Sequence, residues 1–201
     1  MTKSERVVLV DMDGVMADFD TAAVKSIPED LRVDRSHFYV AQDYEEALRP
    51  SIEVAYNAPG FFENLEPMPG LLEAWQIMID NGYQPQVASA PLSSNPTAIE
   101  GKIKWLDRIM VPEFGAQVVE RAIIDKNKWQ YGGLALIDDR PSVPRGIGDS
   151  NMAEWEHVLF GWQHHLNVPM ATAAFRLLSW NDTKDLISIL DTIDGSILKS
   201  Y

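Results

Sequence analysis

The feature that most constrains the fold is the apolar run Val7–Val10, which leads directly into Asp11-Met12-Asp13-Gly14. A continuous run of valine and leucine is typical of a strand that is buried on both faces of a parallel sheet. Similar apolar segments recur along the chain and alternate with segments of helical character. Alternating strands and helices predict an α/β fold built on a doubly wound parallel sheet. The other expected strands lie at residues 86–88, 118–124, 134–137 and 157–160.

Proline, glycine and asparagine mark the expected helix boundaries. Pro69-Gly70 opens one helix and Gly82 ends it, while Asn95-Pro96 begins a second helix that runs to about residue 109. A third helix is expected over residues 182–190. Between residues 17 and 57 the pattern is helical but irregular, because prolines at positions 28 and 50 interrupt it.

Polar side chains follow three of the expected strands. These are Asp11, Ser89 and the pair Asp138-Asp139. In doubly wound sheets, ligands bind outside the carboxyl ends of the strands. We therefore expect all four side chains to meet in one crevice.

The spacing of Asp11 and Asp13 suits phosphoryl transfer. A phosphate monoester resists attack because its own oxygens repel a nucleophile, and Mg²⁺ would neutralise that charge and orient the ester. One carboxylate can then attack phosphorus and form an aspartyl-phosphate. The other can protonate the leaving oxygen and later activate a water. Taken alone, the pattern is explained equally well by acidic residues that start a loop, with Gly14 in its turn.

The other strand-end residues offer ligands that such a site needs. Asp138 and Asp139 present hard oxygen ligands for Mg²⁺, although acidic pairs are also common in turns. Ser89 and the backbone amide at Ala90 suit phosphate binding, although a hydroxyl at the end of a strand is more often only structural.

Lysines near these residues would offset the charge of phosphate and of the clustered acids. Lys126 follows the third expected strand, with Lys128 as a nearby competitor. Lys102 and Lys104 lie on the helix after Ser89, and one of them could reach a phosphate, although both could equally be solvated. In each case the alternative is a solvated surface lysine.

The charge balance restricts the partners. Lysine and arginine total 17 against 30 acidic residues, so the net charge is -13. Because stable nucleic-acid binding depends on cationic side chains, no such partner is expected. A small phosphorylated substrate remains compatible, since a bound cation reverses the field within one cleft. The chain has no cysteine, and no apolar stretch suits a signal peptide or a membrane span, so we expect a cytoplasmic protein without membrane contact.

The order Asp-x-Asp-Gly-Val, Ser, Lys and Asp-Asp at successive strand ends resembles the haloacid dehalogenase (HAD)-like superfamily. Several segments more narrowly resemble the 5′(3′)-deoxyribonucleotidases, which remove phosphate from nucleoside monophosphates and prefer deoxyribose forms. The resemblance covers about residues 6 to 190. The segments that carry it are residues 59–70 (PGFFENLEPMPG), 125–126 (DK), 136–141 (LIDDRP), 155–160 (WEHVLF) and 178–180 (LSW).

The resemblance implies an enzyme with a HAD-like α/β core, residues 1–16 plus 66–201, and a small helical cap inserted after the first strand, residues 17–65. Asp11 would be the nucleophile and a Mg²⁺ ligand, and Asp13 the acid/base and a ligand through its carbonyl. Asp139 would complete the metal site, with Asp138 beside it. Phosphate would be held by Ser89, Ala90, Lys102 and Lys126. The base and sugar pocket would be lined by Phe19, Phe38, Tyr39 and Tyr56.

Three departures from the family pattern leave phosphate binding and base preference open. Ala90 stands where the family has a second hydroxyl. Tyr39 and Tyr56 stand where it has tryptophan. The spacing from Lys126 to Asp139 is two residues longer than in the animal enzymes, which we interpret as a loop insertion.

The leading hypothesis is hydrolysis of deoxyribonucleoside 5′(3′)-monophosphates, preferably of pyrimidines. One alternative is a phosphatase for another small phosphomonoester, such as a sugar phosphate or a polynucleotide end, the latter disfavoured by the acidic composition. Another is a catalytically silent nucleotide-binding protein on the same fold, against which the presence of Asp11 and Asp13 argues. Similar enzymes are often dimers, so a homodimer stays open.

Overall fold

The computed structural model describes residues 6–148, 150–162 and 170–198. Its centre is a sheet of six parallel strands in the order β3-β2-β1-β4-β5-β6. This is the order of doubly wound sheets, so the predicted α/β class is confirmed. The strands are β1 (Val7–Val10), β2 (Gln84–Ser89), β3 (Ile123–Ile124), β4 (Ala135–Asp138), β5 (Glu156–Phe160) and β6 (Phe175–Leu177).

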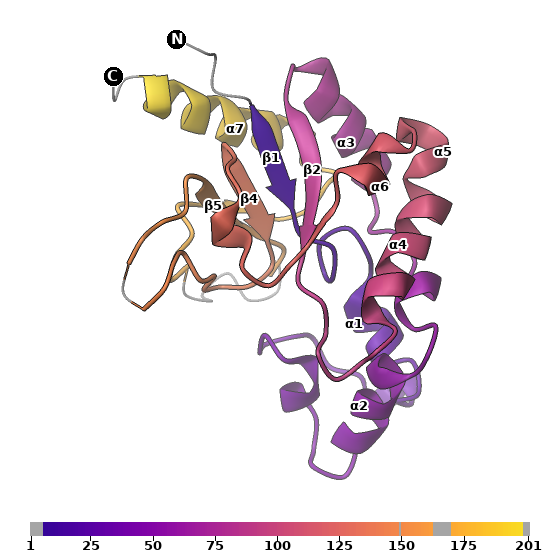
Figure 1. The fold of residues 1–201 in the computed structure, drawn as a ribbon. Coiled ribbons are helices and arrows are strands. Elements are labelled where there is room, and N and C mark those ends of the chain that lie inside the picture. Colours follow the sequence, from indigo (N-terminus) through magenta and orange to yellow (C-terminus); the bar gives the residue numbers. More distant parts are fainter. Residues whose placement is uncertain (1–5, 149, 163–169, 199–201) are drawn as a thin grey trace.

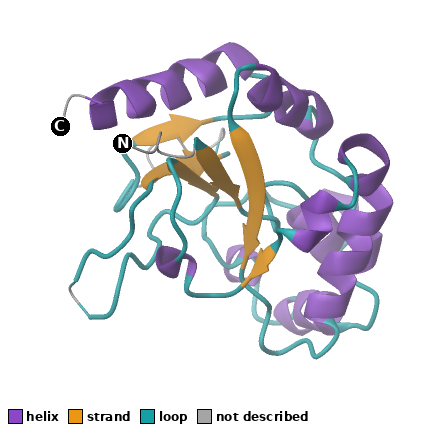
Figure 2. Ribbon diagram, turned by 45° about the horizontal axis from the view of Figure 1, so that its top comes forward, coloured by secondary structure: helices purple, strands orange, loops and turns teal. Residues whose placement is uncertain are grey.

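The helices of the core are α3 (Leu71–Asp80), α4 (Ala98–Ile109), α5 (Val111–Phe114), α6 (Gln117–Glu120) and α7 (Thr183–Leu198). Three of them, α3, α4 and α7, lie where the sequence predicts helices, whereas α5 and α6 were not predicted. Helix α7 extends beyond the predicted end at residue 190, and Leu186, Leu190 and Ile193 are buried along it. Figure 2 shows α7 lying across the strands on one side of the sheet. Within the described ranges, no helix is long and apolar enough to cross a membrane.

The prediction of a strand over residues 118–124 is wrong for its first half. Gln117–Glu120 forms the helical turn α6, which the amide of Arg121 extends by donating to the carbonyl of Gln117. Packing overrides the strand preference of the valines, because Val118 is buried in the main core from this turn. Of residues 118–124, only Ile123–Ile124 forms a strand, and this strand pairs with β2. The short edge strand β6 was not predicted.

Alternate residues of β1 face opposite sides of the sheet, as the pleat requires. Val8 and Val10 belong to the main hydrophobic core, which also contains buried residues of α3, α4 and α7. Leu9 belongs to a smaller cluster on the other face. That cluster contains Trp155, so the second face is covered mainly by the irregular connection between β4 and β5 rather than by a helix.

A group of short helices lies beside the core, between β1 and α3 in the chain (Figure 1). Its elements are α1 (Phe19–Ala23), η1 (Glu29–Leu31), η2 (Val40–Asp43), α2 (Arg49–Asn57) and η3 (Phe62–Asn64). It has a hydrophobic cluster of its own, centred on Ile27, Val40 and Ile52. This is the small helical cap that the sequence predicts after the first strand.

The two ends of the cap lie side by side where they join the core. The amide of Asp18 donates to the carbonyl of Glu66, and the amide of Met68 donates to the carbonyl of Met16, each at 2.8 Å. Residues Ala17 and Pro67 form an antiparallel bridge between these bonds. The peptide that follows the Asp11–Asp13 loop is therefore also the base of the cap.

Candidate active site

Three acidic side chains meet at the point where the strand order reverses. Asp11 follows β1, Asp138 is the last residue of the neighbouring strand β4, and Asp139 follows it. The amide of Asp11 donates to the carbonyl of Ile137 at 2.9 Å, which holds the two strand ends in register. Each acid offers a carboxylate oxygen, and these oxygens lie within 4.8 Å of one another. The structure thus brings together the predicted strand-end acids.

The lysine beside these acids is Lys128 and not Lys126, which corrects the sequence-based prediction. Lys128 Nζ lies 2.8 Å from Asp11 Oδ1 and 2.6 Å from Asp138 Oδ2, whereas the side chain of Lys126 is exposed. The intervening loop explains the difference. Asp125 Oδ1 accepts from the amide of Asn127 at 2.8 Å, and this turn leads into the short helix η4 (Lys128–Gln130), which carries Lys128 inward.

If Lys128 takes the place of the family's lysine, the spacing needs no loop insertion. Counted from Lys128, the spacing to Asp139 is shorter by the two residues that had looked like an insertion. Trp155 Nε1 donates to the carbonyl of Lys128 at 3.3 Å and anchors the lysine's backbone from the second face of the sheet.

Burial and mutual repulsion dominate the electrostatics of the acids. Burial raises the pKa of Asp11, with Asp138 adding to the effect and Lys128 opposing it. Burial also raises the pKa of Asp139 to about 7, although Arg35 opposes the shift. Asp138 differs: burial opposes its ionisation, but Lys128 and the amide of Arg140 together bring its pKa below the usual value. When all three acids are ionised, they carry more negative charge than Lys128 and Arg35 balance, so a bound cation would favour the ionised cluster.

The acids differ in how many of their oxygens the protein already occupies. Asp138 Oδ2 is held by Lys128, and Asp138 Oδ1 accepts from the amide of Arg140 at 2.9 Å. Asp139 Oδ2 accepts from Arg35 at 2.7 Å, but no hydrogen bond from the described residues reaches its Oδ1. Asp139 is thus better placed than Asp138 to give an oxygen to a metal, and the donor set fits a hard cation.

Asp13 is held from the side of β2. Lys102 Nζ, which is fully buried, donates to Asp13 Oδ2 at 2.7 Å and to Ser89 Oγ at 2.9 Å. The other carboxylate oxygen, Asp13 Oδ1, is buried without a hydrogen-bond partner in the described part of the chain. Lys102 and Ser89 therefore lie behind Asp13, one layer away from the open pocket.

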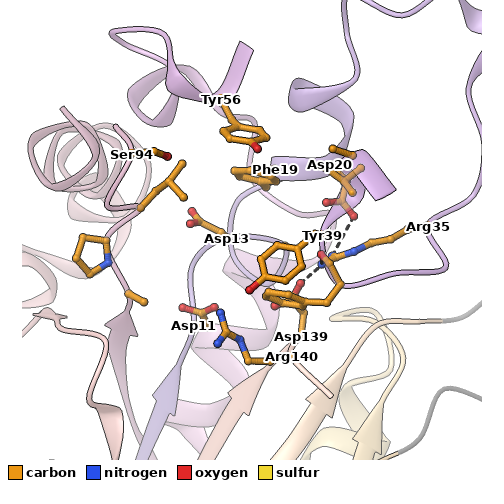
Figure 3. A pocket seen from close by; sticks show the side chains of 17 residues that line it. Asp11, Asp13, Phe19, Asp20, Arg35, Tyr39, Tyr56, Ser94, Asp139 and Arg140 are labelled. Carbon is orange, nitrogen blue, oxygen red and sulfur yellow. Dashed lines mark hydrogen bonds and ion pairs between the residues drawn. The ribbon is translucent and has the colours of Figure 1, made fainter. Parts of the chain in front are cut away.

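A pocket of about 270 Å³ opens between the core and the cap, above these acids (Figure 3). Figure 3 shows Asp11 on the core side of the pocket, beyond the end of its strand, and Phe19 and Tyr56 on the cap side. Among the predicted site residues, the pocket is lined by Asp11, Asp13, Phe19, Phe38, Tyr39, Tyr56, Ala90 and Asp139. The predicted residues outside its lining are Ser89, Lys102, Lys126 and Asp138.

Aromatic rings form two groups in this pocket. The Phe19 and Tyr56 rings are 5.8 Å apart, and the Phe38 and Tyr39 rings meet edge-to-face at 5.1 Å. Tyr39 is 63% exposed, so its ring is accessible from solvent. Such surfaces can stack on a flat ligand and exclude water from the acids beneath it.

Sequence reasoning missed four polar residues that line the pocket: Asp20, Arg35, Ser94 and Arg140. Arg140 directly follows the acidic pair, so its position in the sequence was a usable signal, and its guanidinium lies 4.5 Å from the centre of the Phe38 ring. Arg35 and Asp20 belong to the irregular cap segment, where no periodic pattern indicates which side chains face the core.

His157 lies on β5, beside the strand that ends in the acidic pair, and it is fully buried. Its Nδ1 is 2.9 Å from Thr172 Oγ1, and burial lowers its pKa to about 4. The unfolded chain binds this proton near pH 6.5, so stability should fall by about 3 kcal/mol as the pH drops from 6.5 to 4. Urea unfolding across this range should show a shallower loss for His157→Gln than for the wild type. An equal loss in the two proteins would contradict the assignment.

The fold is shared with solved structures of the HAD class. A HAD-type protein from Bacillus subtilis, solved with bound magnesium, superposes with a TM-score of 0.51 and 14% identity, and the match covers 94% of this chain and 99% of that one. A six-stranded parallel sheet with acids at the ends of β1 and β4 and an inserted cap is thus the HAD-like fold.

Sequence comparison then identifies the family. Residues 5–192 match the family described as 5′ nucleotidase, deoxy (pyrimidine), cytosolic type C. The chain is 36% identical to the human cytosolic-type 5′(3′)-deoxyribonucleotidase over 98% of each protein. It is 30% identical to the human mitochondrial 5′(3′)-deoxyribonucleotidase, over 92% of this chain and 82% of the relative. The chain belongs to the 5′(3′)-deoxyribonucleotidase family and is a phosphomonoester hydrolase, as its resemblance predicts.

Proposed function

We propose that this enzyme hydrolyses deoxyribonucleoside 5′- or 3′-monophosphates, preferably of pyrimidines, with Mg²⁺ as its cofactor. The observation that carries the proposal is the composition of one pocket, which has Asp11 and Asp13 on its core side and aromatic rings on its cap side. A phosphate at the acids and a base among the rings match a nucleotide in chemistry. The match to deoxyribonucleotidases over nearly the whole chain supports the same substrate class.

Asp11 is the proposed nucleophile. Its carboxylate attacks phosphorus, the bond to the ester oxygen breaks, and an aspartyl-phosphate forms. Lys128, 2.8 Å from Asp11 Oδ1, opposes the effect of burial and favours the ionised form of this carboxylate. The pKa of Lys128 itself is raised, because Asp11 and Asp138 outweigh the effect of its own burial, so the lysine stays charged.

Asp13 is the proposed general acid and base. Lys102 fixes its Oδ2, which leaves Oδ1 to give a proton to the leaving oxygen. After the nucleoside departs, the same oxygen takes a proton from the water that attacks the aspartyl-phosphate. Lys102 and Ser89, which the sequence suggested as direct phosphate ligands, thus act in our proposal by holding Asp13. The backbone at Ala90, which lines the pocket, is the proposed phosphate contact.

Asp11, Asp139 and the carbonyl of Asp13 are the proposed metal ligands, and Asp138 orients Lys128 beside them. Mg²⁺ bound there would neutralise the phosphate and hold it in line with Asp11. The acidic cluster, whose carboxylate oxygens lie within 4.8 Å of one another, supports this assignment, and the structurally similar Bacillus subtilis protein was solved with magnesium.

We infer a division into a core of residues 1–16 plus 66–201 and a cap of residues 17–65. Paired hydrogen bonds between residues 16–18 and 66–68 support boundaries at these positions. The separate hydrophobic cluster of the cap supports its role as a distinct unit. In this division the core carries the chemistry, and the cap supplies Phe19, Phe38, Tyr39 and Tyr56 to the base and sugar.

The proposal is tested with a panel of phosphomonoesters at saturating Mg²⁺. We expect phosphate release from dUMP and dTMP, slower release from the ribonucleotide UMP, and little from glucose 6-phosphate. EDTA should abolish the release, and added Mg²⁺ should restore it, because the buried acids need a cation to accept a phosphate. Release from sugar phosphates with none from the nucleotides would overturn the substrate assignment while leaving the phosphatase chemistry intact.

A further inference from the structure

Arg35 reaches from the cap to an acid of the metal site. It lies in the segment between η1 and η2, and its Nη1 donates to Asp139 Oδ2 at 2.7 Å. The same nitrogen donates to Asp20 Oδ2, at the start of the cap, at 3.1 Å. Figure 3 shows the guanidinium between these two carboxylates. One side chain therefore joins the cap to the proposed metal ligand.

The rest of the guanidinium fixes the backbone that carries the aromatic pair. Nη2 donates to the carbonyl of Phe38, and Nε donates to the carbonyl of His37 at 3.1 Å. The group lies over the rings of Phe38 and Trp162, and only 18% of the Arg35 side chain is exposed. Such a network leaves the arginine little freedom, so its position determines where Phe38 and its neighbour stand.

The core is shaped to receive this arginine. Trp162, which lies over the guanidinium, donates through Nε1 to the backbone carbonyl of Asp139 at 2.7 Å. Gly14, with a φ of +73°, lies against the Asp139–Arg35 pair, and a Cβ on it would come within 2.6 Å of Asp139 Oδ2. A glycine in the nucleophile loop thus makes room for the ion pair.

The charges around Arg35 indicate whether it competes with a metal ion for Asp139 or orients Asp139 for that ion. A lone arginine beside Asp139 would compete with a metal ion for the carboxylate. Here Asp20 shares the same nitrogen and offsets the positive charge of the arginine. Asp139 also has a second oxygen, Oδ1, that Arg35 does not contact. Arg35 is therefore placed to orient Asp139 as a metal ligand, and not to occupy the place of the metal.

We propose that Arg35 is a positioning residue that couples the cap to the metal site, because one guanidinium both orients Asp139 for the cation and holds the Phe38–Tyr39 backbone over the pocket. The role of Arg35 in orienting Asp139 rests on the proposed metal site. The role of Arg35 in ordering the cap does not depend on a metal. Loss of Arg35 should accordingly weaken metal binding and loosen the cap together.

The first measurement is Mg²⁺ binding by calorimetry, without substrate. We expect Arg35→Gln to weaken Mg²⁺ affinity about 10- to 100-fold, the range typical when the outer partner of a metal ligand is lost. The matched control is Arg32→Gln, because Arg32 lies in the same segment, is exposed, and donates to the carbonyls of Ile27 and Lys25 within the cap. Arg35→Lys keeps the charge but not the fork, and should fall between the two.

The second measurement is amide hydrogen exchange over residues 36–41, in EDTA and in Mg²⁺. We expect faster exchange in Arg35→Gln than in the wild type or Arg32→Gln under both conditions. Unchanged or tighter Mg²⁺ binding by Arg35→Gln would overturn the proposal. Tighter binding would mean that Arg35 competes with the metal. If Arg35→Gln does not fold, Arg35→Lys carries the same test.

These outcomes are distinct from failure of the proposed function. A wild-type protein that binds no Mg²⁺ would overturn both the metal assignment and the coupling. A wild-type protein that binds Mg²⁺, with normal binding and exchange in Arg35→Gln, would overturn the coupling alone. A negative result on the nucleotide panel would leave both measurements unaffected, since neither uses a substrate.

Discussion

Asp11→Asn should reduce phosphate release on the order of 10⁴-fold or more, because the amide cannot serve as the nucleophile. The fold should survive, since Lys128 keeps its contact with Asp138 and an amide fills nearly the same volume as the carboxylate. The measurement is phosphate release from the best nucleotide of the panel, together with urea unfolding of the same preparation.

A matched control for this variant is Asp107→Asn, a change of the same chemistry at an exposed position on α4. It should leave both turnover and the free energy of unfolding nearly unchanged. Turnover in Asp11→Asn within tenfold of the wild type would remove Asp11 as the nucleophile, whatever the stability shows.

Lys128→Met should have the second large effect, and it should act on both activity and stability. Without the ammonium group, Asp11 and Asp138 lie buried together with no cation between them. Breaking a buried ion pair on one side costs about 3–5 kcal/mol. Activity should fall about 10²- to 10³-fold, the scale seen when one charge-stabilising group is removed from an active site. Added Mg²⁺ should recover part of the stability, because it neutralises the same carboxylates.

Lys126→Met is the paired control, and it distinguishes the structure from the sequence-based assignment. Lys126 is exposed and two residues away, so its loss should change the free energy of unfolding by no more than about 0.5 kcal/mol. Its turnover should stay within about twofold of the wild type, as for other exposed substitutions. An inactive Lys126→Met beside an active Lys128→Met would show that Lys126, and not Lys128, is the lysine that serves the acids.

The acids at the strand ends could be predicted from sequence because their position depends on local rules. A buried strand has a visible apolar run, and in a parallel sheet the residues after each strand gather at one edge. Asp11 and Asp139 follow such runs, so their meeting needed no knowledge of loops. The register of β1 with β4 then sets their separation.

The two lysines show where this reasoning stops. In Asp125-Lys126-Asn127-Lys128, composition alone does not reveal which lysine turns inward. The choice depends on the backbone amide of Asn127, which donates to the Asp125 carboxylate, and on Trp155, which lies far along the chain and donates to the carbonyl of Lys128. Contacts of this kind are tertiary, so no local pattern records them.

Arg35 was beyond prediction for a related reason. It pairs with a residue 104 positions away, across the boundary between cap and core. Its segment has neither helical nor strand periodicity, so no face can be assigned to it from sequence. The strand prediction near residue 118 failed for the opposite reason. There the valines have a strong local preference for a strand, but packing in the core overrides it.

The paired bonds at residues 16–18 and 66–68 have a consequence for how such enzymes diversify. Because the chain leaves the core for the cap and returns to it at adjacent positions, the cap is an insertion whose two ends lie side by side. A lineage can lengthen, replace or recombine that insertion without altering the order of the strands or the acids at their ends. Under the proposed division of roles, a protein engineer who exchanges the cap would change substrate choice, and would have to keep an arginine in the place of Arg35 to retain the contact with Asp139.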